Sequence, residues 1–330
     1  MFGMSKVLCV GWAFAGLLAV NSLQPHMQAR HASASFGAFR RVDIPGQLVE
    51  FARDQTSGLS AELSLGTLLA FEPLVEANDQ LFLFLSGSVL ACRNYSQLLE
   101  TVAARMRVLC LPYDNRVTVA ELCGADNLCY TQARLAAYNG SFASVPGNNI
   151  ESRLASALKY LQREDSSSWG QYLTQTGKPE WRQMRLAGHS QGAGDAAFIA
   201  YLTNVARVVQ FSGVCDVSDW TMKMGPPATP AARFFGLASV HDTMCLSQFY
   251  AWRAEGALPQ SAKPQVVEQC EKVPQLGSAQ VVLSKLDAVG CEGDDYNGAD
   301  CAVKAHESTA CNWPGASPYT GGLWQALAGI

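Results

Sequence analysis

The sequence predicts an α/β protein with a mostly parallel, doubly wound sheet flanked by helices. Apolar runs typical of strands buried on both faces alternate along the chain with stretches of helical spacing. Such alternation is typical of a parallel sheet wound by right-handed crossovers. The chain has 330 residues, of which 48% are hydrophobic, and no shift in composition divides it. We therefore expect a single domain over residues 35–330 with a sizeable core.

The expected elements follow a mixed region at 35–78, where "QLVEF" and "SAELSLGTLLAFEP" suggest two edge strands. The run "DQLFLFLSGSV" at 79–89 predicts a strand buried on both faces. Further strands are expected at 106–114, 182–188, 206–213, 232–239 and 279–285, and helices at 95–105, 149–164, 195–204, 244–256 and in the closing "GLWQALAG". Residues 115–149 have a loop-like pattern, and they and 220–231 are candidate lid or cap segments.

The N-terminus has the pattern of a secretory signal. Lys6 precedes the apolar run "VLCVGWAFAGLLAV", which is shorter than the roughly 20 residues of a membrane span. We expect a signal peptide within residues 1–34, cleaved between 22 and 34, and a secreted, extracellular protein, or a periplasmic one in a bacterium. Ala32-Ser33-Ala34 and Val20-Asn21-Ser22 are the candidate cleavage sites. An uncleaved signal anchor and a buried helix are the alternatives.

The cysteines also indicate export. Of the 11 cysteines, Cys9 lies in the apolar run, and its removal leaves an even number, as in a fully paired oxidised domain. Position along the chain suggests three pairs as hypotheses: Cys123–Cys129, Cys215–Cys245 and Cys301–Cys311.

Charge and motifs exclude several classes of partner. The net charge is −4 and no long basic run occurs, so neither nucleic acid nor a stable membrane span is expected. The sequence contains no C-x-x-C and no H-E-x-x-H, so we expect no metal and no cofactor.

The stretch "GHSQGAG" contains the candidate nucleophilic serine. Gly188, Ser190 and Gly192 satisfy G-x-S-x-G, a weak pattern alone. Here it follows the predicted strand "RQMRLAG" and opens a predicted helix, which is the context that a nucleophilic serine on a strand-to-helix turn requires. The peptide N–H of Gln191 then lies at a helix N-terminus, where it can stabilise an oxyanion. The alternative is a structural glycine turn with an idle serine.

A nucleophilic serine needs a general base. Among the five histidines, His26 and His31 lie in or near the signal, and His189 is adjacent to Ser190 and cannot reach back in the usual geometry. His306 follows the last predicted strand, where the base is expected, and His241 follows an earlier strand.

Several aspartates are candidates for the acid that orients the base. Asp242 follows the strand at 232–239 and is favoured. Asp216, after the preceding strand, is the alternative acid, and Asp219 ranks behind both. Asp216 and Asp219 also fit helix capping before "WTMKM". Asp287 falls after the final strand and ranks last.

The second oxyanion donor is expected in the loop after "LFLFL". That loop reads Ser86-Gly87-Ser88, where Gly87 permits a sharp turn and the N–H of Ser88 is the candidate donor. A simple β-turn is the alternative.

These motifs resemble the serine hydrolases of the α/β-hydrolase fold, and more narrowly a group of secreted esterase- or lipase-like members. The matching segments occur in the same order: "CGADNLCYTQAR", "NNIESRLASALKYL", "GHSQGAGDAAFIA", "ARVVQFSG" and "TPAARFFGLASVHDT". The resemblance implies Ser190 as nucleophile, Asp242 as acid and His306 as base. At the oxyanion loop many relatives read Pro-Gly-Thr-Gly-Gly, where this chain reads "SGSVLAC".

The sequence thus predicts a secreted serine hydrolase that cleaves carboxylic esters, of small molecules or lipids, through an acyl-enzyme. A catalytically silent binding protein on the same fold is the alternative.

Overall fold

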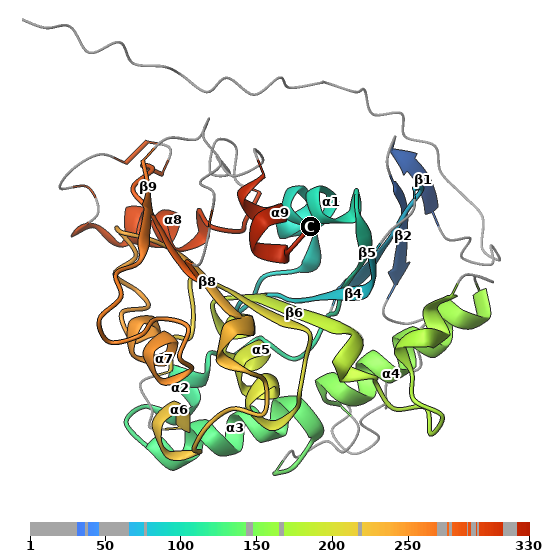
Figure 1. Cartoon of the computed structure of the whole chain (residues 1–330), viewed down its shortest axis with the longest axis horizontal. Coiled ribbons are helices and arrows are strands. Elements are labelled where there is room, and N and C mark those ends of the chain that lie inside the picture. Colours follow the sequence, from blue (N-terminus) through green and yellow to red (C-terminus); the bar gives the residue numbers. More distant parts are fainter. Residues whose placement is uncertain are drawn as a thin grey trace, which may run out of the picture.

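A ten-stranded sheet forms the centre of the protein (Figure 1). A computed structural model describes residues 32–36, 39–45, 66–75, 78–142, 148–164, 168–216, 220–268, 276, 279–288, 290–291, 295, 297–312 and 322–330. The strands are β1 (Ala32–Phe36), β2 (Phe39–Pro45), β3 (Thr67–Pro73), β4 (Asn78–Leu85), β5 (Met106–Cys110), β6 (Met184–His189), β7 (Arg207–Phe211), β8 (Phe234–Ser239), β9 (Gln265–Val267) and β10 (Val281–Ser284).

The strand order is β1-β2-β3-β5-β4-β6-β7-β8-β10-β9. From β5 to β9 each neighbouring pair is parallel. β1, β2 and β3 extend the other end in antiparallel pairing. The sequence-based expectation of a mostly parallel α/β sheet is therefore confirmed.

Helices cover both faces of the sheet (Figure 1). They are α1 (Ser96–Ala103), α2 (Val119–Cys123), α3 (Asn127–Asn139), α4 (Ile150–Glu164), α5 (Gln191–Leu202), α6 (Trp220–Lys223), α7 (Gln248–Ala254), α8 (Ala299–Glu307) and α9 (Leu323–Ala328). α1 and α9 pack on one face, and α4, α5 and α7 pack on the other. Within the described ranges, no helix combines the length and the apolar character needed to cross a membrane.

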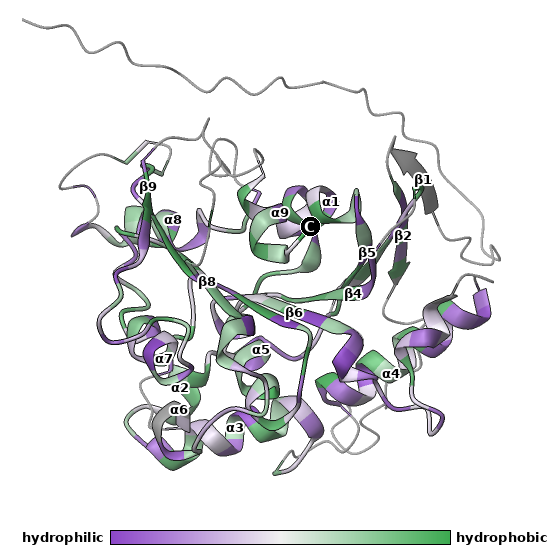
Figure 2. Ribbon diagram, viewed as in Figure 1, coloured by the Kyte–Doolittle hydropathy of each residue, from purple (hydrophilic) through white to green (hydrophobic). Residues whose placement is uncertain are grey.

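Strand β4 shows why its sequence is a near-continuous apolar run. Successive side chains of a strand point to opposite faces. Leu81, Leu83 and Leu85 enter the core under α4 and α5, whereas Phe82 and Phe84 enter the core under α1 and α9. Both faces of β4 are buried, so neither can be polar. Green predominates at the centre of the sheet in Figure 2, although β6 also has a purple stretch.

Two expectations about the elements were wrong, and one edge strand was not predicted. Residues 115–149 are not a loop, because they contain α2 and α3. β3 is not an edge strand, since it pairs with both β2 and β5. The edge strand beyond β10 is β9, which was not predicted because three residues are too few to show a period.

Some predicted features fall at or beyond the described residues. The first 31 residues and "QLVEF" at 47–51 lie outside them. Of the two candidate cleavage sites, Ala32-Ser33-Ala34 coincides with the start of β1, which pairs with β2.

Four disulfides link described cysteines: Cys92–Cys110, Cys123–Cys129, Cys215–Cys245 and Cys291–Cys301. Two of the three suggested pairs are thereby confirmed, and Cys301–Cys311 is wrong. Cys301 lies in α8, and a helical hydrogen bond from Cys311 N–H to the Glu307 carbonyl (2.9 Å) prolongs the turn. At 1.5 Å per residue the two Cα atoms are roughly 15 Å apart, whereas a disulfide needs about 4.4–6.8 Å.

A polar cluster is buried between β7 and α7. The buried face of α7 and the residue after it contribute Gln248, Trp252 and Glu255, which are spaced as on one side of a helix. Glu255 accepts a hydrogen bond from Gln210 Nε2 of β7 (2.6 Å). Glu255 Oε1, Gln210 Oε1 and Trp252 Nε1 have no hydrogen-bond partner in the described structure. Burial raises the pKa of Glu255 to about 8, against a weaker opposing effect of Gln210.

The Glu255→Gln variant should become more stable than the parent as the pH rises, because the parent loses stability and the variant does not. The pKa of Glu255 is higher in the folded chain than in the unfolded one, so its contribution to stability is complete below the unfolded value and is lost as pH rises through about 8. We expect the variant to match the parent at pH 4 and to exceed its free energy of unfolding by on the order of 4 kcal/mol at pH 9. Urea unfolding without reductant measures this difference, and Glu268→Gln, on an exposed glutamate, is the control. Parallel pH curves for the parent and Glu255→Gln would contradict the assignment.

Candidate active site

The candidate site lies at the carboxyl edge of the parallel strands. The chain runs from β4 outward to β5 and then returns to β6 on the other side of β4, so the direction of winding reverses between β4 and β6. In open α/β sheets, ligands bind outside the carboxyl ends of the strands at such a switch point. The Ser86-Gly87-Ser88 loop follows β4, and Ser190 follows β6.

Ser190 occupies a strained turn between β6 and α5. Its φ of 54° and ψ of −117° are unusual for a residue with a side chain. The backbone is held there because Ser190 N–H donates to the Phe211 carbonyl (2.9 Å), while the Ser190 carbonyl accepts from Ala193 N–H (3.1 Å). A Cβ on Gly192 would lie 2.2 Å from the Leu85 carbonyl oxygen, so only glycine fits. These contacts fix the backbone of Ser190 in the turn between β6 and α5.

Asp242 and His306 meet at the same edge. His306 Nδ1 lies 3.0 Å from Asp242 Oδ2, and the two residues are 5% and 4% exposed. Met244 N–H donates to Asp242 Oδ1 (3.1 Å). His306 lies in α8, a helix that is not among those expected from the sequence. A buried carboxylate at Nδ1 sets the tautomer in which Nε2 has the lone pair of a base.

The other described histidines lie in different environments. His241 is partly exposed, and its Nε2 lies 3.7 Å from Asp287 Oδ1, so the lowest-ranked acid candidate pairs with the other candidate base. His189 is buried, with its ring centroid 5.0 Å from that of His306. Asp219 lies outside the described residues.

Asp216, the alternative acid, does not contact His306. Its two oxygens accept from Arg134 Nε (2.9 Å) and Nη2 (2.6 Å), and Trp220 Nε1 donates to it as well (2.6 Å). Asp216 is thus committed to a buried ion pair that was not predicted. The same arginine also contacts Asp195 (2.8 Å) and donates to the carbonyl of Gln191 (2.8 Å).

Arg134 therefore ties α3 to the start of α5 and to the loop after β7. Burial by itself lowers the pKa of Arg134, but Asp216 and Asp195 outweigh it and raise that pKa above the usual value. Burial raises the pKa of Asp195. Arg134 holds the turn that contains Gln191, so α3 supports the candidate site through this cluster.

The Arg134→Met variant should be strongly destabilised. Removing the arginine leaves two buried carboxylates without their cation, which costs about 3–5 kcal/mol. Arg116→Met is the matched control, because Arg116 pairs with Asp114 (2.8 Å) at the surface, where such a pair contributes about 0–1 kcal/mol. Urea midpoints of both variants measure the difference, and equal midpoints would show that the buried cluster adds no more stability than the surface pair.

The Ser86-Gly87-Ser88 loop, the expected source of the second oxyanion donor, touches both Ser190 and Gln191. A Cβ on Gly87 would lie 3.2 Å from Ser190 Cβ, so the loop backbone passes directly beside the serine. Leu90 N–H donates to the Gly87 carbonyl (3.2 Å), which closes a turn around Ser88 and Val89. Ser88 Oγ donates to Gln191 Oε1 (2.7 Å), and this bond joins the two residues expected to stabilise an oxyanion.

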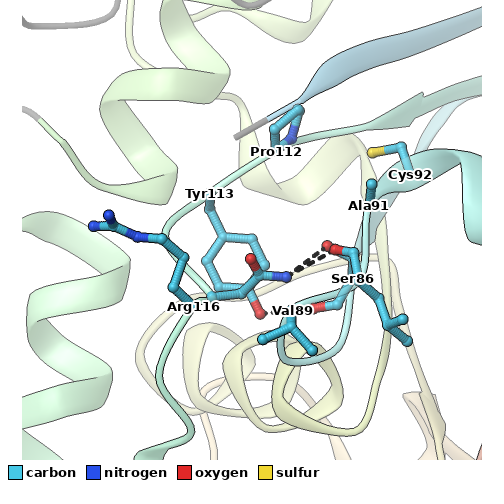
Figure 3. Close-up of a pocket in the computed structure, with 9 residues that line it drawn as sticks. Ser86, Val89, Ala91, Cys92, Pro112, Tyr113 and Arg116 are labelled. Atoms are coloured by element: carbon cyan, nitrogen blue, oxygen red, sulfur yellow. Dashed lines mark hydrogen bonds between the residues drawn. The ribbon is translucent and has the colours of Figure 1, made fainter. Parts of the chain in front are cut away.

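A pocket of about 140 Å³ borders this loop (Figure 3). Ser86, Val89 and Ala91 form one wall, and Pro112, Tyr113 and Arg116, from the segment after β5, form the other. Asn115 donates from Nδ2 to Ser86 Oγ (3.2 Å) and to the Leu90 carbonyl (2.9 Å). The segment after β5 thus fixes the shape of the loop from the pocket side.

Tyr95, Asn115 and Ser212 support the site, although none was predicted. Ser212 Oγ donates to the carbonyl of His306 (2.7 Å), and Tyr95 Oη lies 3.1 Å from His189 Nδ1. Their partners are mostly backbone atoms distant along the chain, and a backbone atom leaves no signal in the sequence.

Comparison with known proteins found distant structures only. No family model and no curated protein matches this chain. One similar solved structure is a PEG-bound, cold-adapted esterase from an Arctic intertidal metagenomic library (10% identity, TM-score 0.36, 70% of this chain and 86% of that one). Another is an α/β serine hydrolase homologue from Coxiella burnetii (12% identity, TM-score 0.36, 67% and 83%). A third is esterase 2 of Thermogutta terrifontis, phosphoramylated by tabun (12% identity, TM-score 0.33, 57% and 72%).

Proposed function

We propose that the protein is a serine hydrolase that cleaves carboxylic esters, with Ser190 as nucleophile, His306 as general base and Asp242 as the acid that orients it. One observation carries the proposal: the buried Asp242–His306 pair lies at the sheet edge where the chain also forces Ser190 into a strained strand-to-helix turn. That combination of a serine, a histidine and a buried acid suits acyl transfer.

The first half of the reaction forms an acyl-enzyme. Ser190 Oγ attacks the ester carbonyl carbon while His306 Nε2 takes the hydroxyl proton. Asp242 accepts the Nδ1–H of His306 and stabilises the imidazolium that forms. The tetrahedral intermediate then expels the alcohol, which leaves with the proton that His306 returns to it.

The backbone N–H groups of Gln191 and Ser88 stabilise the oxyanion in this proposal. Gln191 is the first residue of α5, and the first N–H groups of a helix have no acceptor within it. Each such donor contributes about 3–4 kcal/mol in comparable sites. The second half repeats the chemistry with water as nucleophile, which releases the acid and regenerates Ser190. No step requires a cofactor or a metal.

The proposal extends to the fold and the location. The helices on both faces and the parallel strand order support the doubly wound arrangement of the α/β-hydrolase fold. Four disulfides support an oxidising compartment, and with the signal-like N-terminus they favour an extracellular protein.

Two assays on the folded chain test the function. A fluorophosphonate should label the protein, and mass mapping should place the adduct on Ser190. p-Nitrophenyl esters of short and medium chains should be hydrolysed, with a burst of p-nitrophenol equal to the labelled fraction. Folded protein that neither takes the label nor cleaves any ester would instead support the silent binding protein.

A further inference from the structure

His189 and Tyr95 lie between the oxyanion loop and His306, and the mechanism above uses neither. Four buried groups form one line of hydrogen bonds: Gly87 N–H to Tyr95 Oη (2.9 Å), Tyr95 Oη to His189 Nδ1 (3.1 Å), and His189 Nε2 to the carbonyl oxygen of His306 (3.1 Å). We call this line the Tyr95–His189 bridge. Its two ends are the loop that contains Ser88 and the backbone of the proposed base.

We infer that His189 and Tyr95 are positioning residues whose bridge sets the oxyanion loop relative to the backbone of His306. The inference rests on the proposed function. It makes His189 a fixed, uncharged spacer between the loop that contains Ser88 and the backbone of His306.

Which group donates and which accepts in each bond of the bridge follows from the His306 carbonyl at one end. The His306 carbonyl can only accept, so His189 Nε2 must have a proton. Neutral His189 then has a lone pair at Nδ1, which accepts the single proton of Tyr95. Tyr95 Oη in turn accepts from the Gly87 amide. With this assignment a donor faces an acceptor in each of the three bonds, and a neutral His189 can do this only as the Nε2–H tautomer.

The surroundings keep the bridge uncharged. Burial, and to a smaller extent the nearby His306, lower the pKa of His189 to about 3. Burial raises the pKa of Tyr95 well above its usual value, and the nearby Cys311 and Tyr113 raise it further. Cys311 also hydrogen-bonds with Tyr95, and burial raises the pKa of its thiol. A charged His189 would break the pattern, because Nδ1 would become a donor facing Tyr95, and it would repel the His306 imidazolium during turnover.

Packing makes the bridge rigid. The rings of Tyr95 and Phe84 lie 4.7 Å apart, and those of Tyr95 and His189 lie 5.7 Å apart. Ser212 Oγ holds the same His306 carbonyl from another strand end (2.7 Å). The base is therefore fixed through its backbone as well as through Asp242, and a shift of the loop at Gly87 is transmitted to His306.

The first test needs no activity. In the wild-type chain labelled with ¹⁵N-histidine, long-range ¹H–¹⁵N spectra report the tautomer and charge of each ring, and His189→Gln assigns the resonance. We expect His189 to be neutral with its proton on Nε2 from pH 5 to pH 8. A His189 that titrates in this range, or that has its proton on Nδ1, overturns the bridge whatever the protein catalyses.

The second test is kinetic, per site titrated with fluorophosphonate. Tyr95→Phe keeps the ring but leaves the Gly87 amide and His189 Nδ1 unpaired, so kcat should fall about 10- to 100-fold while KM changes less than about threefold. His189→Phe should lose as much, and the double variant should lose no more than either single variant. His189→Gln, which can donate to His306 and accept from Tyr95, should recover kcat to within about fivefold of wild type.

The control is Tyr172→Phe, which removes a buried hydroxyl near Arg107 at the start of β5, away from the catalytic edge. It should leave kcat unchanged. Wild-type kcat in Tyr95→Phe, or no recovery in His189→Gln, overturns the positioning role. An unlabelled, inactive wild type instead overturns the proposed function, and the tautomer measurement still decides the bridge.

Discussion

Replacing Ser190 with alanine is expected to lower kcat for p-nitrophenyl ester hydrolysis by about 10⁵- to 10⁶-fold. The nucleophile is lost, and what survives is the stabilisation of an oxyanion and the binding of the ester, which alone give modest catalysis by water. The fold should persist, because the turn is held by backbone bonds to Phe211 and Ala193 that alanine retains. Steady-state rates together with circular dichroism measure both effects.

Ser152→Ala is the matched control, since Ser152 lies on α4, outside the proposed site. It should show the kcat of the parent. Equal rates for Ser190→Ala and the parent would falsify Ser190 as the nucleophile, and labelling that persists in Ser190→Ala would identify another reactive serine.

Replacing Asp242 with asparagine is expected to lower kcat by about 10⁴-fold with little change in KM. Asparagine has nearly the same shape, but its amide no longer holds His306 in the tautomer with a basic Nε2, and it does not stabilise the imidazolium. The magnitude follows from the burial of the pair, because no water replaces the lost charge at Nδ1.

Asp216→Asn separates the two acids that the sequence left open. Asp216 is bound by Arg134 and Trp220, so this variant should lose stability and should retain kcat per titrated site to within about tenfold. If Asp216→Asn lost activity about 10⁴-fold and Asp242→Asn did not, the roles of the two aspartates would be reversed. Active-site titration with fluorophosphonate separates loss of folded protein from loss of rate.

Much of the central sheet was predictable because the burial of each strand determines the residue types within that strand itself. β4 is apolar throughout since alternate side chains enter two different cores, and β6 and α5 frame Ser190 with small residues that allow close contact. The order of the strands also places the ends of β4, β6 and β8 at one edge. Sequence reasoning therefore found residues that do lie together, including Asp242 and His306.

Helix α3 shows why other parts could not be predicted. Tyr130, Arg134 and Tyr138 lie on its buried face at successive turns, so an arginine stands where an apolar residue is expected. The arginine is tolerated only because Asp195 and Asp216 neutralise it, and both are remote in the sequence. A pattern that depends on partners from other elements gives no periodic signal.

The histidine beside Ser190 illustrates a similar limit. Adjacency to Ser190 excluded His189 as the expected base, and the structure instead shows it bonded to Tyr95 and to the His306 carbonyl. One partner lies on a distant element and the other is a backbone atom, whose identity does not depend on residue type. Only the three-dimensional arrangement distinguishes a positioning side chain from one that merely packs.

The arginine of α3 also bears on how this protein can be re-engineered. One conceivable chimera exchanges residues 115–149, the candidate lid or cap segment, for a segment of another protein. Such an exchange would remove Arg134, which neutralises Asp195 and Asp216 outside the exchanged segment. It would also remove the hydrogen bond that Arg134 donates to the Gln191 carbonyl. A workable chimera must therefore carry an arginine at the position of Arg134, or replace Asp195 and Asp216 in the same step.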